Sequence, residues 1–174
     1  MRKPLMVLCL AAGSAVAVPL PASADEGDPA VGSRTAVTAA SVSASPSAPF
    51  QQQVLALVNW NRRKHGCGPL TLDQRLISAA NRHAADMARR DYFDHESPGG
   101  RDAGDRVTGA GYAWSRYGEN IAKGQDSPYE VMVAWLRSPA HRKNILDCQL
   151  DEMGTGLAVE GRTAYWVQDF ASPR

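Results

Sequence analysis

Large apolar residues recur every three or four positions in two stretches of the chain, the spacing of one helix face. The first stretch contains Phe50, Val54, Leu57 and Val58. It ends at His65-Gly66, and a glycine in this position is usual at helix C-termini. The second stretch runs to about Arg90 and has one mainly apolar face: Leu72, Leu76, Ala79, Ala80, His83 and Met87. We predict a helix over each stretch, with His83 in the core.

Proline, glycine and serine mark the elements that follow. Residues 91–104 are predicted to form a loop, and residues 105–110 a short helix. Ser127-Pro128-Tyr129-Glu130 has the pattern of a capping box with proline at the first helical position, so a helix is expected from there to about Arg137. Ser138-Pro139 repeats this start signal and predicts a further short helix.

The C-terminal part of the domain has the alternation of β-strands. Residues 153–159 alternate larger side chains with Gly154, Gly156 and Ala158, and residues 164–170 form an aromatic-rich run after a short turn. This pattern predicts a hairpin. A strand face made of glycine and alanine lets a helix backbone approach closely. The expected fold class is α+β, an α/β/α sandwich of helices packed around a small, mainly antiparallel sheet.

The first 24 residues have the organisation of a secretory signal peptide. Arg2 and Lys3 precede an apolar run over residues 5–18, and the small residues Ala22-Ser23-Ala24 come after it. We place cleavage after Ala24 and expect a secreted, extracellular protein. A membrane anchor is the alternative, but the run is shorter than the roughly 20 residues of a spanning helix. We expect no transmembrane segment in the rest of the chain.

Composition separates a linker from a globular domain. Residues 25–49 are rich in Ala, Ser and Pro, which predicts a flexible linker, and residues 50–174 have the composition of one domain. Loss of the two basic residues of the leader lowers the count of Lys and Arg from 19 to 17, against 18 Asp and Glu. This balance gives no electrostatic basis for binding nucleic acid or anionic lipid. Separately, we expect the protein to be a monomer.

Two cysteines remain after the leader, which contains Cys9, is removed. Cys67 and Cys148 most simply form a disulfide in an exported chain, and two buried free thiols are the alternative. A disulfide closing a loop of this length stabilises a protein by about 4–5 kcal/mol in the chain-entropy model. Titration of free thiols in the unfolded, unreduced protein distinguishes the two states.

Four short strings occur in a fixed order along the chain. They are Asp91-Tyr92-Phe93-Asp94-His95, Gly118-Glu119-Asn120-Ile121, the run from Trp135 through Ser138-Pro139-Ala140-His141 to Leu146, and Tyr165-Trp166-Val167-Gln168-Asp169-Phe170. In this order they resemble a bacterial secreted domain of the CAP superfamily, also called SCP, over Phe50 to Ala171. Members of actinobacterial type have a Gly-Cys after the first helix and a later cysteine, so the resemblance supports the Cys67–Cys148 disulfide.

The resemblance also implies a candidate site. The family shares a cleft with two histidines and two acidic residues, which in some members binds a divalent metal such as zinc. His95, Glu119 and His141 match three of these positions. Ser138 stands where the fourth, acidic residue is expected, which removes one negative charge and lowers the expected affinity for metal.

The chemistry of His95, Glu119 and His141 has two interpretations. Two imidazoles and a carboxylate are suitable zinc ligands, and three protein ligands plus water is the composition of a catalytic zinc site. Alternatively, Glu119 bridges the two imidazoles in a metal-free polar cluster, which satisfies groups that otherwise cost about 1–3 kcal/mol each to bury. A zinc titration by calorimetry with His95→Ala as control separates these alternatives.

Two functions from different classes follow. The first is an extracellular binding module whose cleft holds a divalent metal or another ligand: a small molecule, a lipid or a cell-wall component. The second is a metal-assisted hydrolase of peptide or cell-wall substrates, with zinc-bound water as the nucleophile and Glu119 as ligand or base. Without the fourth acid, a Glu119 engaged as a ligand leaves no evident base, which favours binding.

Two single residues complete the predictions. Ser138 resembles a helix N-cap whose hydroxyl accepts from backbone N–H groups, which argues against a role as serine nucleophile. Trp114 lies in a polar stretch and is expected to be the most exposed of the tryptophans.

Overall fold

The computed structural model describes residues 49–174, so the predicted leader and nearly all of the predicted linker lie outside the described residues. The described part contains five helices and one four-stranded sheet. The helices are α1 (Phe50–Lys64), α2 (Gln74–Arg90), α3 (Ala103–Gly109), α4 (Pro128–Arg137) and α5 (Pro139–Ile145). The strands are β1 (Thr71–Leu72), β2 (Trp114–Lys123), β3 (Glu152–Glu160) and β4 (Thr163–Pro173).

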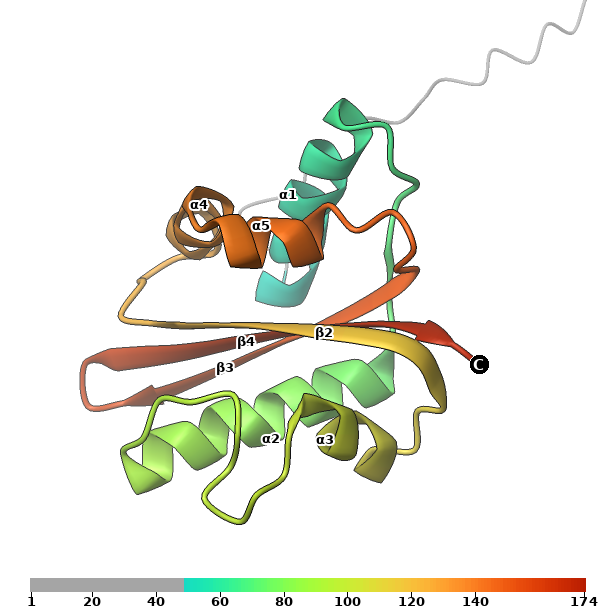
Figure 1. Cartoon of the computed structure of the whole chain (residues 1–174). Coiled ribbons are helices and arrows are strands. Elements are labelled where there is room, and N and C mark those ends of the chain that lie inside the picture. The colour runs from blue at the N-terminus through green and yellow to red at the C-terminus, as the bar shows by residue number, and fades with distance from the viewer. Residues whose placement is uncertain (1–48) are drawn as a thin grey trace, which may run out of the picture. The chain divides into compact units, whose positions relative to one another are not determined.

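The sheet lies between two layers of helices (Figure 1). Its strand order is β1-β3-β4-β2; the short β1 pairs with β3 in parallel, and the other two pairings are antiparallel. Helices α2 and α3 cover one face, and α1, α4 and α5 cover the other. The predicted fold class, an α/β/α sandwich around a mainly antiparallel sheet, is confirmed.

Two glycines of β3 bring α2 against the sheet. A Cβ atom at Gly154 would overlap the backbone of Leu76 and Ile77, and one at Gly156 would overlap the backbone of Ala80 and Asn81. No side chain fits at these two positions while α2 stays in place. The close approach predicted for the glycine face is therefore confirmed.

The opposite layer has the larger apolar core and the disulfide. Trp135 of α4 packs there with Trp166 and Phe170 of β4, all three buried. Cys67 and Cys148 form the predicted disulfide, with their Cα atoms 4.9 Å apart. The bond joins the end of α1 to the segment after α5, so it lies entirely on this side of the sheet.

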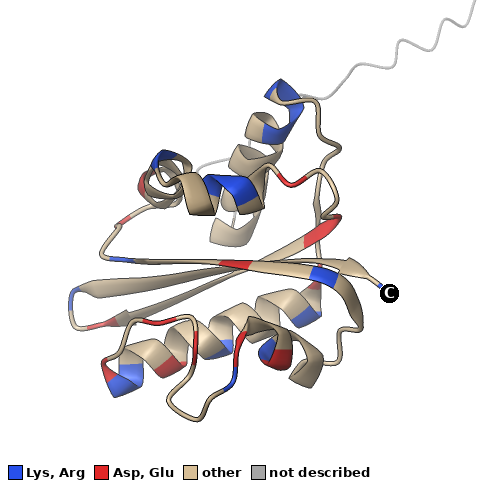
Figure 2. Cartoon of the chain, in the orientation of Figure 1, with Lys and Arg blue, Asp and Glu red and all other residues tan. Residues whose placement is uncertain are grey.

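Charged residues are concentrated on helices and loops, whereas the strands carry few (Figure 2). One of the charged helix residues, Arg62 of α1, is buried in the layer formed by α1, α4 and α5. It donates hydrogen bonds to four carbonyl oxygens, at distances of 2.8–3.1 Å. The acceptors belong to Gly68, Ile145, Asp147 and Leu150. Arg62 therefore holds the same two segments that the disulfide joins.

Three local predictions need correction. The short helix begins at Ala103 because Asp102 and Asp105 form a capping box, a signal that lies within the predicted loop. Ser127 caps α4 through Glu130 N–H, but the Glu130 carboxylate accepts from Asp126 N–H, so the box is not reciprocal.

The third correction concerns exposure of tryptophans. Trp60 is 49% exposed, under the ammonium of Lys64, whereas Trp114 is partly buried. The reason is that the Trp114 ring packs against Tyr117 and its Nε1–H donates to Thr108 of α3. The polar sequence around Trp114 did not indicate these contacts with Tyr117 and Thr108.

Candidate functional site

Glu119 is the centre of the candidate site. It lies on β2, the edge strand of the sheet, and its side chain is only 3% exposed. One carboxylate oxygen is 2.7 Å from Nδ1 of His95, and the other is 2.6 Å from Nη2 of Arg106. Both oxygens of this buried carboxylate are therefore engaged.

His95 reaches Glu119 from the loop after α2. The preceding residues hold this loop: Nε2 of buried His83 donates to the carbonyl oxygen of Asp94 at 3.0 Å, and the Asp94 side chain accepts from Glu96 N–H. His83 is thus the core histidine expected from its helix face, and it also positions the loop. The His95 side chain is 53% exposed, so its ring presents Nε2 while Nδ1 is held by Glu119.

Arg106 of α3 was not predicted as a site residue. Its side chain is 6% exposed, and besides Glu119 it contacts the loop: Nη1 donates to the carbonyl oxygen of Arg101 at 2.9 Å and to Ser97 Oγ at 3.3 Å. One buried guanidinium therefore joins α3, the loop of His95 and β2. The available sequence signal was the Asp102–Asp105 capping box, which places a helix here but does not reveal what Arg106 contacts.

Asp169 is the second residue that sequence reasoning missed. It lies directly opposite Glu119 in the β2–β4 register and is 1% exposed. Burial, followed by the negative charge of Glu119, raises the pKa of Asp169 well above its usual range. A lone acid in a run of buried strand residues was the signal that could have identified it.

His141 comes from the other helical layer. It lies on α5, and its carbonyl oxygen accepts from Asn120 Nδ2 at 3.2 Å. Asn120 also donates to Gln168 of β4, and Asn144 of α5 donates both to Asn120 and to the carbonyl oxygen of Glu119. These amides tie α5 to β2 on the face of the sheet opposite to the Glu119 carboxylate.

The pKa values of His95 and His141 are shifted in opposite directions. The hydrogen bond to Glu119 raises the pKa of His95, against a smaller effect of burial. Burial, and then the positive charge of His95, lowers the pKa of His141. Burial alone would raise the pKa of Glu119, but the His95 hydrogen bond and the Arg106 charge together lower it. These shifts favour the anionic form of Glu119, the protonated form of His95 and the neutral form of His141.

The predicted residues are thus arranged differently from either interpretation of the sequence. Glu119 contacts one imidazole and a guanidinium, and not two imidazoles. Ser138 ends α4 and begins α5, but its hydroxyl makes no capping hydrogen bond to α5. This corrects the predicted capping role of Ser138. In the described part of the chain its hydroxyl makes no hydrogen bond to His141 either.

The donor set does not fit a metal ion in this arrangement. Within residues 49–174, no group of three or more His, Cys, Asp and Glu side chains is placed to hold one. Glu119 would have to exchange Arg106 or His95 for the metal, and the nearby guanidinium charge opposes a divalent cation. Ser138 supplies no charge that would offset this repulsion.

Fold and site together define a class of protein. A four-stranded sheet between two helical layers, with a His–Glu–Arg cluster at its edge strand, is an α/β/α domain of SCP type. The model of the CAP family, described as the cysteine-rich secretory protein family, matches residues 55–170, and the chain belongs to this family.

Individual relatives agree with this assignment. The chain is 37% identical over 143 residues to uncharacterized protein YkwD of Bacillus subtilis (strain 168), a match that covers 79% of this chain and 55% of that protein. An extracellular SCP-domain protein of Bacillus anthracis str. Ames superposes with a TM-score of 0.66 at 32% identity, over 70% of this chain and 40% of that one.

A more distant structure, NaASP2 with Zn2+, has a TM-score of 0.52 at 14% identity, covers 70% of this chain and 78% of that one, and shows a common fold alone. The chain spans about half the length of the two Bacillus proteins. None of the helices in residues 49–174 combines the length and the apolarity needed to cross a membrane.

Proposed function

We propose that the protein is a secreted binding module in which His95 and His141 contact the ligand and Glu119 orients His95. Export is supported by the signal-like sequence of residues 1–24 and by similarity to an extracellular SCP-domain protein. The ligand we expect is a small polar molecule from outside the cell, such as a cell-wall component.

The observation that carries this proposal is an exposed imidazole held by a buried charge pair. Burying Glu119 and Arg106 together costs several kcal/mol of desolvation, and apolar residues of similar volume often stabilise a fold at least as well. The pair orients His95, whose other face is in solvent. The same pair joins α3, the His95 loop and β2, and an exposed imidazole held by a buried charge pair with shifted pKa values is typical of functional sites.

The electrostatics indicate which ligand groups suit the site. With Nδ1 donating to Glu119, a protonated His95 offers its Nε2–H as a charged donor, and the Glu119 hydrogen bond favours this protonated form. His141, whose pKa is lowered, supplies a neutral imidazole that can donate or accept. Carbonyl, carboxylate or hydroxyl oxygens of a ligand complement this pair.

The arrangement gives less support to a zinc-assisted hydrolase. The NaASP2 structure contains Zn2+, but here both oxygens of Glu119 are engaged by His95 and Arg106. Glu119 is therefore committed to positioning His95 and is not free as a base or as a metal ligand.

NMR of the imidazole rings tests the proposal, because the chain has only four histidines. The ring signals are followed while acetate, N-acetylglucosamine, N-acetylalanine or zinc chloride is added to the full chain. We expect at least one organic probe to shift the signals of His95 and His141 together. The His141 shift should be lost in His95→Ala and retained in His65→Ala, which removes an exposed histidine at the C-terminal end of α1.

Two results would overturn the proposal. In the first, the organic probes leave the signals of both His95 and His141 unchanged. In the second, zinc alone shifts them, with a calorimetric heat that disappears in His95→Ala, which would favour the metal-binding interpretation of the same residues.

A further inference from the structure

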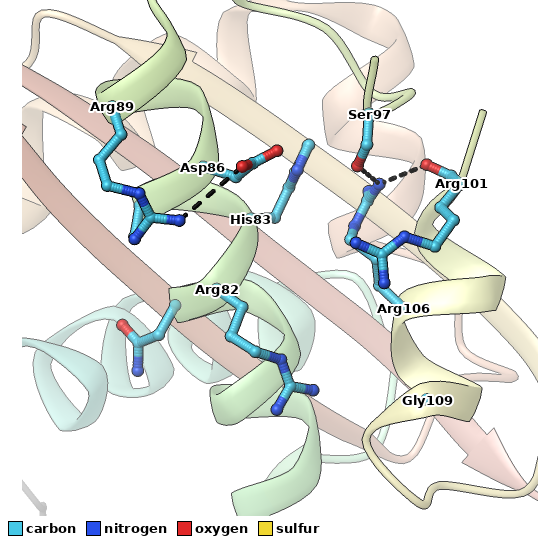
Figure 3. A pocket seen from close by; sticks show the side chains of 10 residues that line it. Arg82, His83, Asp86, Arg89, Ser97, Arg101, Arg106 and Gly109 are labelled. Carbon is cyan, nitrogen blue, oxygen red and sulfur yellow. Dashed lines mark hydrogen bonds and ion pairs between the residues drawn. The ribbon is translucent and has the colours of Figure 1, made fainter. Parts of the chain in front are cut away.

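A cavity of about 400 Å³ lies between α2, the following loop and α3 (Figure 3). This volume is within the range of small-molecule pockets. Four arginines line it: Arg82 and Arg89 of α2, Arg101 of the loop and Arg106 of α3. His95, Glu119 and His141 are not among the lining residues, so the cavity is distinct from the histidine pair, although Arg106 contacts both the cavity and Glu119. We call it the arginine cavity.

Positive charge in the arginine cavity is not balanced by its acidic residues. Asp86 is its single acidic lining residue, and this carboxylate already accepts from Tyr92 Oη at 2.8 Å and lies 3.6 Å from Arg90 and 3.8 Å from Arg89. Within the described residues, Arg82 and Arg101 have no carboxylate at ion-pair distance. An excess of guanidinium charge therefore surrounds the cavity.

The buried arginine adds to this excess. Arg106 shares the charge of Glu119 with His95, so one carboxylate serves two cationic groups. Its Nε atom is buried and has no hydrogen-bond partner in residues 49–174. The Arg106 guanidinium therefore acts on the cavity through its charge, and not through a hydrogen bond from its buried Nε.

The spacing of the exposed arginines suits a polyvalent ligand. Arg82 and Arg89 are seven residues apart and so lie on the same face of α2, with Asp86 between them. Arg101 approaches from the loop, whose backbone is held through Arg106. Planar guanidinium groups bind carboxylate and phosphate in a two-point manner that neutral polar ligands do not match.

We infer that the arginine cavity binds a small organic anion bearing carboxylate or phosphate groups, with Arg82, Arg89 and Arg101 as contacts and Arg106 as the buried charge behind them. This site is independent of the proposed role of His95 and His141. Occupation of the cavity would link α2, the loop and α3.

The test is calorimetric titration of the full chain with citrate and with inorganic pyrophosphate, at matched low ionic strength. Saturable binding of at least one probe is expected, weakening as sodium chloride is raised. In Arg82→Gln/Arg101→Gln the affinity should fall about tenfold or more, because two charged hydrogen-bond donors are removed. Both side chains are exposed, so thermal unfolding should show that this variant remains folded.

A matched control removes the same charge elsewhere. Arg63→Gln/Arg137→Gln alters exposed arginines of α1 and α4, on the other side of the sheet, and should leave the affinity within about twofold. Binding of citrate alone would assign the site to carboxylates, and binding of pyrophosphate alone to phosphates. No saturable binding of either probe, or an equal loss in the control variant, would overturn the inference.

Discussion

Glu119 and Asp169 are paired directly across β2 and β4, so two buried acidic side chains project from the same face of the sheet. Two negative charges this close in a buried site are strongly disfavoured. His95 and Arg106 lower the pKa of Glu119, whereas burial beside that charge raises the pKa of Asp169 and favours its protonated form. The polarity of the site is therefore fixed by which of the two acids holds the proton.

The first prediction concerns Asp169→Asn. A buried acid with a raised pKa costs stability as pH rises from its unfolded-state value, near 4, toward its folded-state value. The neutral amide removes this cost. We expect the variant to melt several degrees above the wild type at pH 7, with the difference disappearing as the pH approaches 4, measured by thermal unfolding across this range. A loss of stability that grows as the pH rises from 4 to 7 would mean that an ionised Asp169 is required and would contradict the prediction.

The second prediction concerns the pKa of His95. In Glu119→Gln the ring loses its anionic partner, so its pKa, measured by NMR titration, should fall. The raised folded-state pKa means that the pair stabilises the fold fully below the unfolded-state value of about 6.5, and that this contribution is lost as pH rises through the folded-state value. His95→Ala should flatten the same part of the stability profile. Glu130→Gln, an exposed acid on α4, serves as control; an unchanged His95 pKa in Glu119→Gln would contradict the assignment.

The third prediction compares two ion pairs. Arg106→Met leaves Glu119 buried with His95 as its remaining charged partner, and removing one member of a buried pair typically costs about 3–5 kcal/mol. Arg116→Met breaks an exposed pair with Asp147 and should cost about 1 kcal/mol or less. Urea unfolding measures both. Equal losses in the two variants would show that Arg106 has no special electrostatic role.

The fourth prediction concerns Arg62. Arg62→Met leaves four carbonyl oxygens near the disulfide without their buried donor, and a loss of about 3 kcal/mol or more is expected in urea unfolding. The neighbouring Arg63→Met alters an exposed side chain and should change stability by less than about 0.5 kcal/mol. A loss in Arg62→Met as small as in the control would mean that water replaces the guanidinium at these carbonyls.

The fifth prediction concerns the disulfide. Cys67 and Cys148 are 81 residues apart in sequence, and the chain-entropy model assigns such a bond about 4–5 kcal/mol, with smaller values common in practice. We expect Cys67→Ser/Cys148→Ser to fold and to unfold at lower urea concentration than the oxidised wild type. Wild-type protein kept in reductant should match the variant; if reductant leaves the urea midpoint of the wild type unchanged, the bond contributes no stability.

Local patterns were sufficient to predict most of the fold. The apolar residues from Phe50 onward predict a helix through their spacing within one element. Gly154 and Gly156 predict a close approach because they lack a side chain. Both signals can be read from the sequence. Ser138 was misjudged because the sequence shows the N-cap pattern but not where the hydroxyl lies. Its backbone has the extended conformation usual for an N-cap, yet no capping hydrogen bond forms.

The site was less predictable for a physical reason. The resemblance supplied His95, Glu119 and His141, but it did not supply Arg106 of α3, whose charge helps to lower the pKa of Glu119, or Asp169 of β4, the second buried acid opposite Glu119. Arginines are frequent on helices, and the sequence around Arg106 does not show whether its side chain is buried or exposed. Asp169 becomes informative only when the β2–β4 register places it opposite Glu119.

The sheet separates the two histidines, because His95 is anchored with α2 and α3 and His141 belongs to the layer that contains the disulfide. The distance between the His95 and His141 rings therefore depends on the thickness of the α/β/α sandwich near β2. Larger side chains between the sheet and either helical layer, far from both rings, would increase the distance between the His95 and His141 rings. Ligand size selection would then be encoded in the core and not in the rings themselves.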